Sequence, residues 1–408
     1  MTFWRDSSLV WIGTLLAAAL AFTVQVLLAR HLGVASFGAM TNCYAIASLI
    51  GIFGFQGVGE VIMRHPTDLR RSMVIRAFLA LFTLASLLAL LTVLFVEPIG
   101  VEMGLMLAFL PFAIVHVGLL AGMVDAQIAH RSLGIAAWPA LLQLGRLLGL
   151  VAVIAIGGSV IQIPLAWAIM LLVPGFLGTR FLLRRTPKLG QADSDQPQET
   201  WATVRAALPF AVTRVIEYAE LQLPVVLAMA MAGAEPTAWI AAALTLLQGM
   251  LLLPFAVFQR LLRPRFHEWG KTDRPRLVRV AFAGGAIMAA IGGVMALVVR
   301  PFAGWLLDLT FGDEFQPAAD FFSMVLLVLP IWFASIAVNA ALVTPRDAYL
   351  RSLFQGVGVV TLALAALALS REGAMTGILI GIFLCQAILL GSGIVILLTG
   401  RHPDHAPR

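Results

Sequence analysis

The sequence predicts an all-α polytopic membrane protein, with twelve transmembrane helices arranged as two six-helix lobes around a central cavity. Two observations predict this class. Hydrophobic residues make up 61% of the 408-residue chain and charged residues only 12%, whereas a soluble domain has about a quarter of its residues charged. Apolar runs of about 20 residues also recur along the chain, and a helix of that length crosses the roughly 30 Å hydrocarbon core of a bilayer.

Twelve apolar runs of this length can be placed along the chain. The expected helices cover residues 9–29, 40–62, 77–96, 105–124, 136–157, 162–183, 206–231, 238–261, 280–299, 319–343, 352–370 and 374–399. The first run has an arginine before it, as a signal peptide does, but its length favours a retained span. Most of the chain is therefore expected to lie in transmembrane helices.

The basic residues predict the orientation of these helices. With the N-terminus inside, all but five of the 27 lysines and arginines fall in cytoplasmic segments. Arg30, Arg300 and Arg371 fall outside, and Arg146 and Arg214 fall within helices. Cytoplasmic loops of membrane proteins are enriched in Lys and Arg, so both termini are expected to be cytoplasmic. The same enrichment accounts for the net charge of +6 without a nucleic-acid partner.

The longest polar stretch divides the chain into two halves. Residues 184–204 are rich in Pro, Gly, acidic and amide residues, which is typical of a linker. They are expected to join an N-terminal six-helix lobe (1–183) to a C-terminal six-helix lobe (205–400), which a cytoplasmic tail (401–408) follows. Because six is an even number, the two halves would share one topology, with a cavity between them that opens to one side at a time.

A second basic stretch, residues 263–279, interleaves arginines with Phe266 and Trp269. Two interpretations remain open. The stretch is either a short segment that lies on the inner membrane surface or an ordinary cytoplasmic loop.

The expected helix 206–231 carries charges that are costly in lipid. Arg214 is followed by Glu217 and Tyr218 at i+3 and i+4, on the same helix face, and then by Glu220. Because a charge at mid-bilayer costs about 2.5 kcal/mol or more on insertion scales, this polar stripe is expected to face a cavity or a partner. Either Arg214 lines a cavity and binds an anionic substrate there, or Arg214 and Glu217 form an ion pair that only locks the two lobes.

Three other polar residues in or beside helices are candidate substrate-binding residues. Arg146, with Gln143 at i−3, is either a cavity arginine or an interhelical hydrogen-bond donor. Arg30 and Gln25 belong to the first helix, where Arg30 can snorkel to the outer surface and Gln25 can bond to a neighbouring helix.

Prolines and glycines mark the expected bending points. Pro209 and Pro224 lie in the helix 206–231, and Gly33 and Gly38 follow the first helix. The first and seventh helices are equivalent in the two halves, so these four residues are candidate hinges for alternating access.

Several short segments resemble one family of exporters. The first, LLARHLGVASFGAM at residues 27–40, resembles the signature that closes the first span of polysaccharide flippases, with Arg30, Leu32, Gly33 and Gly38 in the matching positions. Four further segments agree in order along the chain: residues 54–64, 207–229, 251–266 and 306–322. The chain thus resembles the oligosaccharide-flippase branch of the multidrug/oligosaccharidyl-lipid/polysaccharide exporter superfamily, and a MATE-like architecture is implied.

This resemblance implies a transporter rather than an enzyme. Its substrate would be an undecaprenyl-pyrophosphate-linked oligosaccharide, moved from the cytoplasmic to the periplasmic leaflet of the bacterial inner membrane for O-antigen, exopolysaccharide or capsule synthesis. Membrane lipids, a polysaccharide polymerase and glycosyltransferases would be its partners. The chain departs from many relatives at Pro224, where they carry an acidic residue, so a cation-coupling role of that position does not transfer.

Two alternative functions remain open. A cation-coupled drug or metabolite exporter of the same superfamily needs a buried carboxylate in the N-terminal half, and the nearest candidate is Glu60, at the end of the second helix beside Arg64. A membrane glycan polymerase or ligase needs catalytic groups in a large outer loop, whereas the outer loops expected here are short. No cofactor and no metal are expected, because Cys43 and Cys385 lie in apolar runs away from any histidine cluster.

Overall fold

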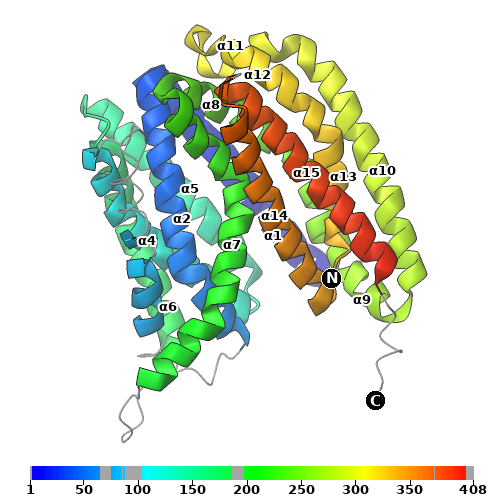
Figure 1. Ribbon diagram of the computed structural model, residues 1–408. Helices are drawn as coiled ribbons and strands as arrows, with labels where there is room; N and C mark the ends of the chain where they lie inside the picture. Colours follow the sequence, from blue (N-terminus) through cyan, green and yellow to red (C-terminus); the bar gives the residue numbers. More distant parts are fainter. Residues whose placement is uncertain are drawn as a thin grey trace, which may run out of the picture. The chain divides into compact units, whose positions relative to one another are not determined.

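The computed structural model describes residues 2–64, 75–84, 86–87, 103–185, 197–371 and 373–400 (Figure 1). Every regular element within these residues is a helix. The helices in the first half are α1 (Thr2–Leu32), α2 (Val34–Arg64), α4 (Met103–Ile128), α5 (Ser132–Ala155), α6 (Gln162–Arg185) and α7 (Pro197–Ala232). Those in the second half are α8 (Ala234–Pro254), η2 (Phe255–Leu262), α9 (Arg263–Thr272), α10 (Arg274–Val299), η3 (Arg300–Phe302), α11 (Ala303–Phe311), η4 (Asp313–Phe315), α12 (Ala318–Val325), η5 (Leu326–Val328), α13 (Leu329–Ala340), α14 (Pro345–Ala368) and α15 (Ala374–Thr399).

Eleven helical runs among the described residues are long and apolar enough to cross a membrane. They coincide with eleven of the twelve expected spans, which confirms an all-α multi-pass membrane protein. The exception is the expected span 77–96, where the described residues include a shorter apolar helix, Ile75–Leu84, and residues 88–96 lie outside the described part.

The chain forms two compact units, Met1–Gln222 and Leu223–Arg408. Their boundary lies inside α7 and not in the expected linker 184–204. Residues 186–196 of that stretch lie outside the described part, and residues 197–204 already belong to α7. The reason is packing: the first half of α7 contributes Val204 and Ala207 to the buried core of the first unit.

The core of the first unit joins helices that are far apart in the chain. Its buried members come from α2, the helix 75–84, α4, α6 and α7: Phe55, Val58, Val61, Ile62, Ala77, Leu81, Val117, Ala121, Val124, Leu182, Val204 and Ala207. This cluster fixes the position of α7 against α2, because both helices bury apolar side chains in it.

In the second unit, α10 packs beside α13, and α15 packs beside both α13 and α14 (Figure 1). Arg274, at the start of α10 and 9% exposed, donates a hydrogen bond to the main-chain oxygen of Leu397 near the end of α15, at 3.0 Å. The last turn of a helix leaves carbonyl groups without an intrahelical donor, so Arg274 caps α15 through its backbone.

The basic stretch 263–279 is helical rather than an irregular loop. It forms α9 and the start of α10, with Asp273 between them capping α10 through the backbone N–H of Arg276. Phe266 is completely buried and packs against Phe258, while the Arg276 guanidinium lies 4.7 Å from the centre of the Trp269 ring. The buried ring of Phe266 thus anchors α9 to the second unit.

Candidate functional site

A glycine brings α2 and α7 into backbone contact inside the first unit. A Cβ atom placed on Gly57 would meet the carbonyl oxygen of Ala207 and would lie 2.9 Å from the backbone nitrogen of Ala211. No side chain larger than hydrogen fits there without moving one of the helices. Near this crossing, the side chains of Glu60 on α2 and Arg214 on α7 reach one another.

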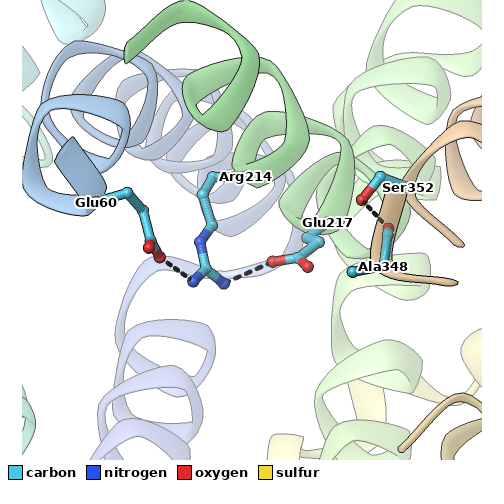
Figure 2. Close-up of polar contacts among 5 residues, drawn as sticks. All are labelled: Glu60, Arg214, Glu217, Ala348 and Ser352. Atoms are coloured by element: carbon cyan, nitrogen blue, oxygen red, sulfur yellow. Dashed lines mark hydrogen bonds and ion pairs between the residues drawn. The ribbon is translucent and has the colours of Figure 1, made fainter. Parts of the chain in front are cut away.

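Arg214 forms ion pairs with two carboxylates, as Figure 2 shows. Its Nη2 donates to Glu60 Oε1 at 2.6 Å, and its Nη1 donates to Glu217 Oε2 at 2.8 Å. The first bond joins α7 to α2, and the second lies within α7. We call these three residues the Arg214 triad. With one cation and two carboxylates, the ionised triad has a formal charge of minus one.

The Arg214 triad is only partly shielded within the chain. The side chain of Arg214 is 40% exposed, and those of Glu60 and Glu217 are 21% and 22% exposed. An exposed edge of the guanidinium can still donate to a third acceptor, since arginine has five N–H donors. The arrangement can therefore hold Arg214 in place and also offer it to an anion.

Sequence reasoning anticipated the Arg214–Glu217 contact but not the role of Glu60 as the second partner. Glu60 drew attention only as a possible coupling carboxylate. The available signal was Gly57, three residues before it, because small residues mark close helix crossings in membranes.

Arg146 belongs to a separate cluster. It is 2% exposed and lies between two aromatic rings, with its Cζ 4.3 Å from the centre of Tyr44 and 4.5 Å from that of Trp167. Its Nη1 donates to Gln143 Oε1 at 2.8 Å and to the Tyr44 hydroxyl at 3.3 Å. Close packing at Gly149 of α5, where an added Cβ would lie 2.9 Å from Trp167 Cδ1, brings Trp167 of α6 against this part of α5.

The remaining predicted binding residues lie on α7 and α1. Tyr218 is 44% exposed and Glu220 is half-buried in the same stretch of α7 as Arg214. Arg30 is exposed at the end of α1, and Gln25 is half-buried one turn earlier.

The four predicted hinge residues occupy different settings. Gly33 has a positive φ of 72° and separates α1 from α2, which is a conformation that favours glycine. Gly38 is buried within α2. Pro209 is exposed and Pro224 is buried, and α7 continues through both as one helix.

No group of three or more His, Cys, Asp or Glu residues that could hold a metal occurs among the described residues. Cys43 and Cys385 are buried and form no disulfide.

The fold and these two arginine clusters define a multi-pass membrane protein that keeps ionic groups inside its transmembrane helices. The family described as "Polysaccharide biosynthesis protein" matches residues 3–269, and the chain belongs to that family. The resemblance predicted from the sequence is thereby confirmed. Comparison with curated protein sequences gives no match.

Solved structures show the same fold. The lipid II flippase MurJ in an inward closed conformation aligns with a TM-score of 0.72 and 13% identity, over 97% of this chain and 88% of that one. A mutant form of the MATE transporter VcmN from Vibrio cholerae aligns with a TM-score of 0.60 and 14% identity, over 97% and 96% of the two chains. The VcmN bent form aligns with a TM-score of 0.55 and 15% identity, over 97% and 98%. At these identities the likeness concerns the fold.

Proposed function

We propose that the protein is a flippase that carries a lipid-linked oligosaccharide across the membrane by alternating access. The substrate is an undecaprenyl-pyrophosphate-linked glycan destined for a cell-surface polysaccharide such as O-antigen, exopolysaccharide or capsule. Transport runs from the cytoplasmic to the periplasmic leaflet of a bacterial inner membrane, with both termini of the protein in the cytoplasm. Membership of the polysaccharide biosynthesis family supports this function.

The observation that carries the proposal is the partial exposure of Arg214 inside a transmembrane helix. A pyrophosphate linkage is anionic, and the guanidinium group binds phosphate oxygens through two parallel hydrogen bonds and stays charged at any working pH. Among the candidate cavity arginines, Arg214 is reachable, whereas Arg146 is 2% exposed.

The two carboxylates give Arg214 a resting state. A lone guanidinium in a transmembrane helix is costly, and Glu60 and Glu217 offset that cost when no substrate is bound. An arriving pyrophosphate competes with both carboxylates for the same N–H donors. Substrate binding would therefore exchange one set of acceptors for another instead of neutralising a bare charge.

This exchange also couples binding to helix movement. Glu60 is the triad member on α2, so its release from Arg214 removes a bond between α2 and α7. The hinges at Gly33 and Pro224 would then permit the helices to rearrange. On this account, the helices rearrange and let a substrate cross only when an anionic group of that substrate replaces Glu60 at Arg214.

The cation-coupled exporter is less well supported by the same geometry. That function needs a carboxylate available to a proton or a sodium ion. Glu60, the candidate in the N-terminal half, instead accepts a 2.6 Å hydrogen bond from Arg214.

The test is a flipping assay with the purified full-length protein in liposomes that contain a lipid-linked oligosaccharide. A membrane-impermeant glycosidase measures how much glycan reaches the opposite leaflet. The expected rate with Arg214→Gln is lower by at least roughly tenfold, because a charge-assisted hydrogen bond contributes about 1.5–3 kcal/mol. Arg180→Gln, which removes an exposed arginine of α6, should leave the rate unchanged.

Unchanged flipping by a correctly folded Arg214→Gln protein would remove Arg214 from the substrate site. Absence of flipping by the wild-type protein, together with cation-dependent export of small molecules, would contradict the flippase function and support the drug-exporter function.

A further inference from the structure

Arg146 is a buried cation that forms no ion pair with a carboxylate among the described residues. Its hydrogen bonds go to the neutral groups of Gln143 and Tyr44, and its remaining contacts are aromatic. The Arg146 cage consists of Arg146 and the rings around it: Tyr44, Phe109, Phe112, His116 and Trp167. This setting differs from that of Arg214, whose charge two carboxylates balance.

The rings offset only part of the cost of burying Arg146. The faces of Tyr44 and Trp167 carry partial negative charge and attract the guanidinium. Phe109, Phe112 and Trp167 are each at most 1% exposed, so water does not solvate the charge from this side. A buried ion that lacks a counter-charge remains unfavourable.

Several buried donors of the cage also lack an acceptor. Among the described residues, Arg146 Nε and Nη2, Trp167 Nε1 and His116 Nδ1 have no hydrogen-bond partner. The guanidinium and indole nitrogens can only donate, whereas the histidine nitrogen donates or accepts according to its tautomer. Buried polar groups in proteins are nearly always hydrogen-bonded, so the cage requires an acceptor.

The charge of the cage selects which acceptor suits it. A water molecule would satisfy one or two donors but would leave the positive charge of Arg146 unbalanced. An anion satisfies the donors and balances the charge together. Because Arg146 is 2% exposed and Trp167 is completely buried, the anion must be small.

We propose that Arg146 and Trp167 bind a small inorganic anion of the halide class in the interior of the first unit. The anion accepts hydrogen bonds from the Arg146 guanidinium and from the Trp167 indole, and it acts as the counter-ion that the helices themselves do not provide. This proposal does not rest on the substrate contact proposed at Arg214.

The test measures thermal unfolding of the purified full-length protein in detergent. Chloride is exchanged for gluconate at constant ionic strength, so that general screening stays the same. A bound anion stabilises the folded state in proportion to the logarithm of its concentration over its Kd. The Tm of the wild-type protein is therefore expected to rise with chloride, and with bromide as well.

Variants test whether the chloride-dependent rise in Tm comes from the Arg146 cage. Arg146→Gln should abolish the chloride-dependent rise, and Trp167→Phe, which keeps an aromatic ring but removes the N–H donor, should reduce it. The matched control Arg180→Gln removes an exposed arginine of α6 and should keep the full rise. If Arg146→Gln fails to fold, Trp167→Phe and the anomalous signal of bromide in crystals still decide the matter.

Equal Tm values in chloride and gluconate for the wild-type protein would overturn the proposal, since water then suffices. A full chloride-dependent rise in Arg146→Gln would overturn it too, because the halide would bind elsewhere. An anomalous bromide peak beside Arg146 and Trp167 would establish the site directly.

Discussion

Glu60 of α2 accepts a 2.6 Å hydrogen bond from Arg214 of α7, across 154 positions of the chain. The bond crosses between two transmembrane helices, and the same guanidinium holds Glu217 on its other side. Two helices that are distant in sequence are thus joined by one shared cation.

This relationship predicts an energetic coupling between Glu60 and Arg214. In a double-mutant cycle of Glu60→Gln and Arg214→Gln, the coupling free energy of unfolding should be about 1 kcal/mol. The value is modest because the Arg214 side chain is 40% exposed. Urea or thermal unfolding in detergent measures it. A coupling free energy of zero would mean that the two side chains act independently.

Gly57→Ala should weaken the first unit and separate the triad. The new Cβ would meet backbone atoms of Ala207 and Ala211, which cannot move as a side chain can. A loss of about 1–3 kcal/mol in the free energy of unfolding is expected from such overpacking, together with slower flipping because Glu60 and Arg214 move apart.

The matched control for this variant is Gly249→Ala in α8. A Cβ at Gly249 would meet nothing within 4 Å, so the change should be neutral or stabilising by up to about 1 kcal/mol. Equal stabilities of the two variants would contradict the close crossing at Gly57.

Two variants of Tyr44 should separate its hydroxyl from its ring. Tyr44→Phe removes a 3.3 Å hydrogen bond from Arg146 and should cost about 0.5–1.5 kcal/mol in unfolding free energy. Tyr44→Leu also removes the ring that lies 4.3 Å from the guanidinium, and should cost more by about 1–2 kcal/mol. Thermal unfolding of both proteins in one detergent provides the comparison, and equal losses would show that the ring contact contributes nothing.

His267 should titrate below the ordinary histidine range. Partial burial, followed by the positive charges of Arg263 and Lys271, lowers the pKa of His267 from 6.5. Because the unfolded chain binds the proton more tightly than α9 does, stability should fall as the pH drops through 6.5.

NMR of isotope-labelled histidine can measure the pKa of His267 in the full-length protein. Lys271→Gln, which removes one of the neighbouring charges, should move that pKa back towards 6.5. A pKa at or above 6.5 in the wild-type protein would contradict the arrangement of basic side chains around α9.

The transmembrane helices could be predicted from sequence because length and apolar composition are local properties. The same reasoning found the contact between Arg214 and Glu217, since residues at i+3 lie on one face of a helix. It expected residues 184–204 to separate the halves because a polar, Pro-containing stretch is typical of a linker. The boundary instead lies within α7, where the burial of Ala207 depends on helices elsewhere in the chain.

The interhelical contacts could not be predicted in the same way. The contact between Glu60 and Arg214 depends on how α2 crosses α7 at Gly57, and one sequence does not specify which helices cross. The position of Arg146 between Tyr44 and Trp167 likewise requires the packing of α5 on α6 at Gly149. Sequence reasoning therefore identified both arginines as unusual but not the groups that hold them.

The hydrogen bond from Arg274 to Leu397 has a consequence for how this protein tolerates mutation. The acceptor is a main-chain oxygen, which every amino acid supplies, so a missense change at position 397 leaves the acceptor in place. A premature stop codon before that position would remove the main-chain acceptor, and the nearly buried Arg274 would lose this hydrogen bond. The end of the last helix should therefore accept substitutions that preserve its apolar packing, but not truncation.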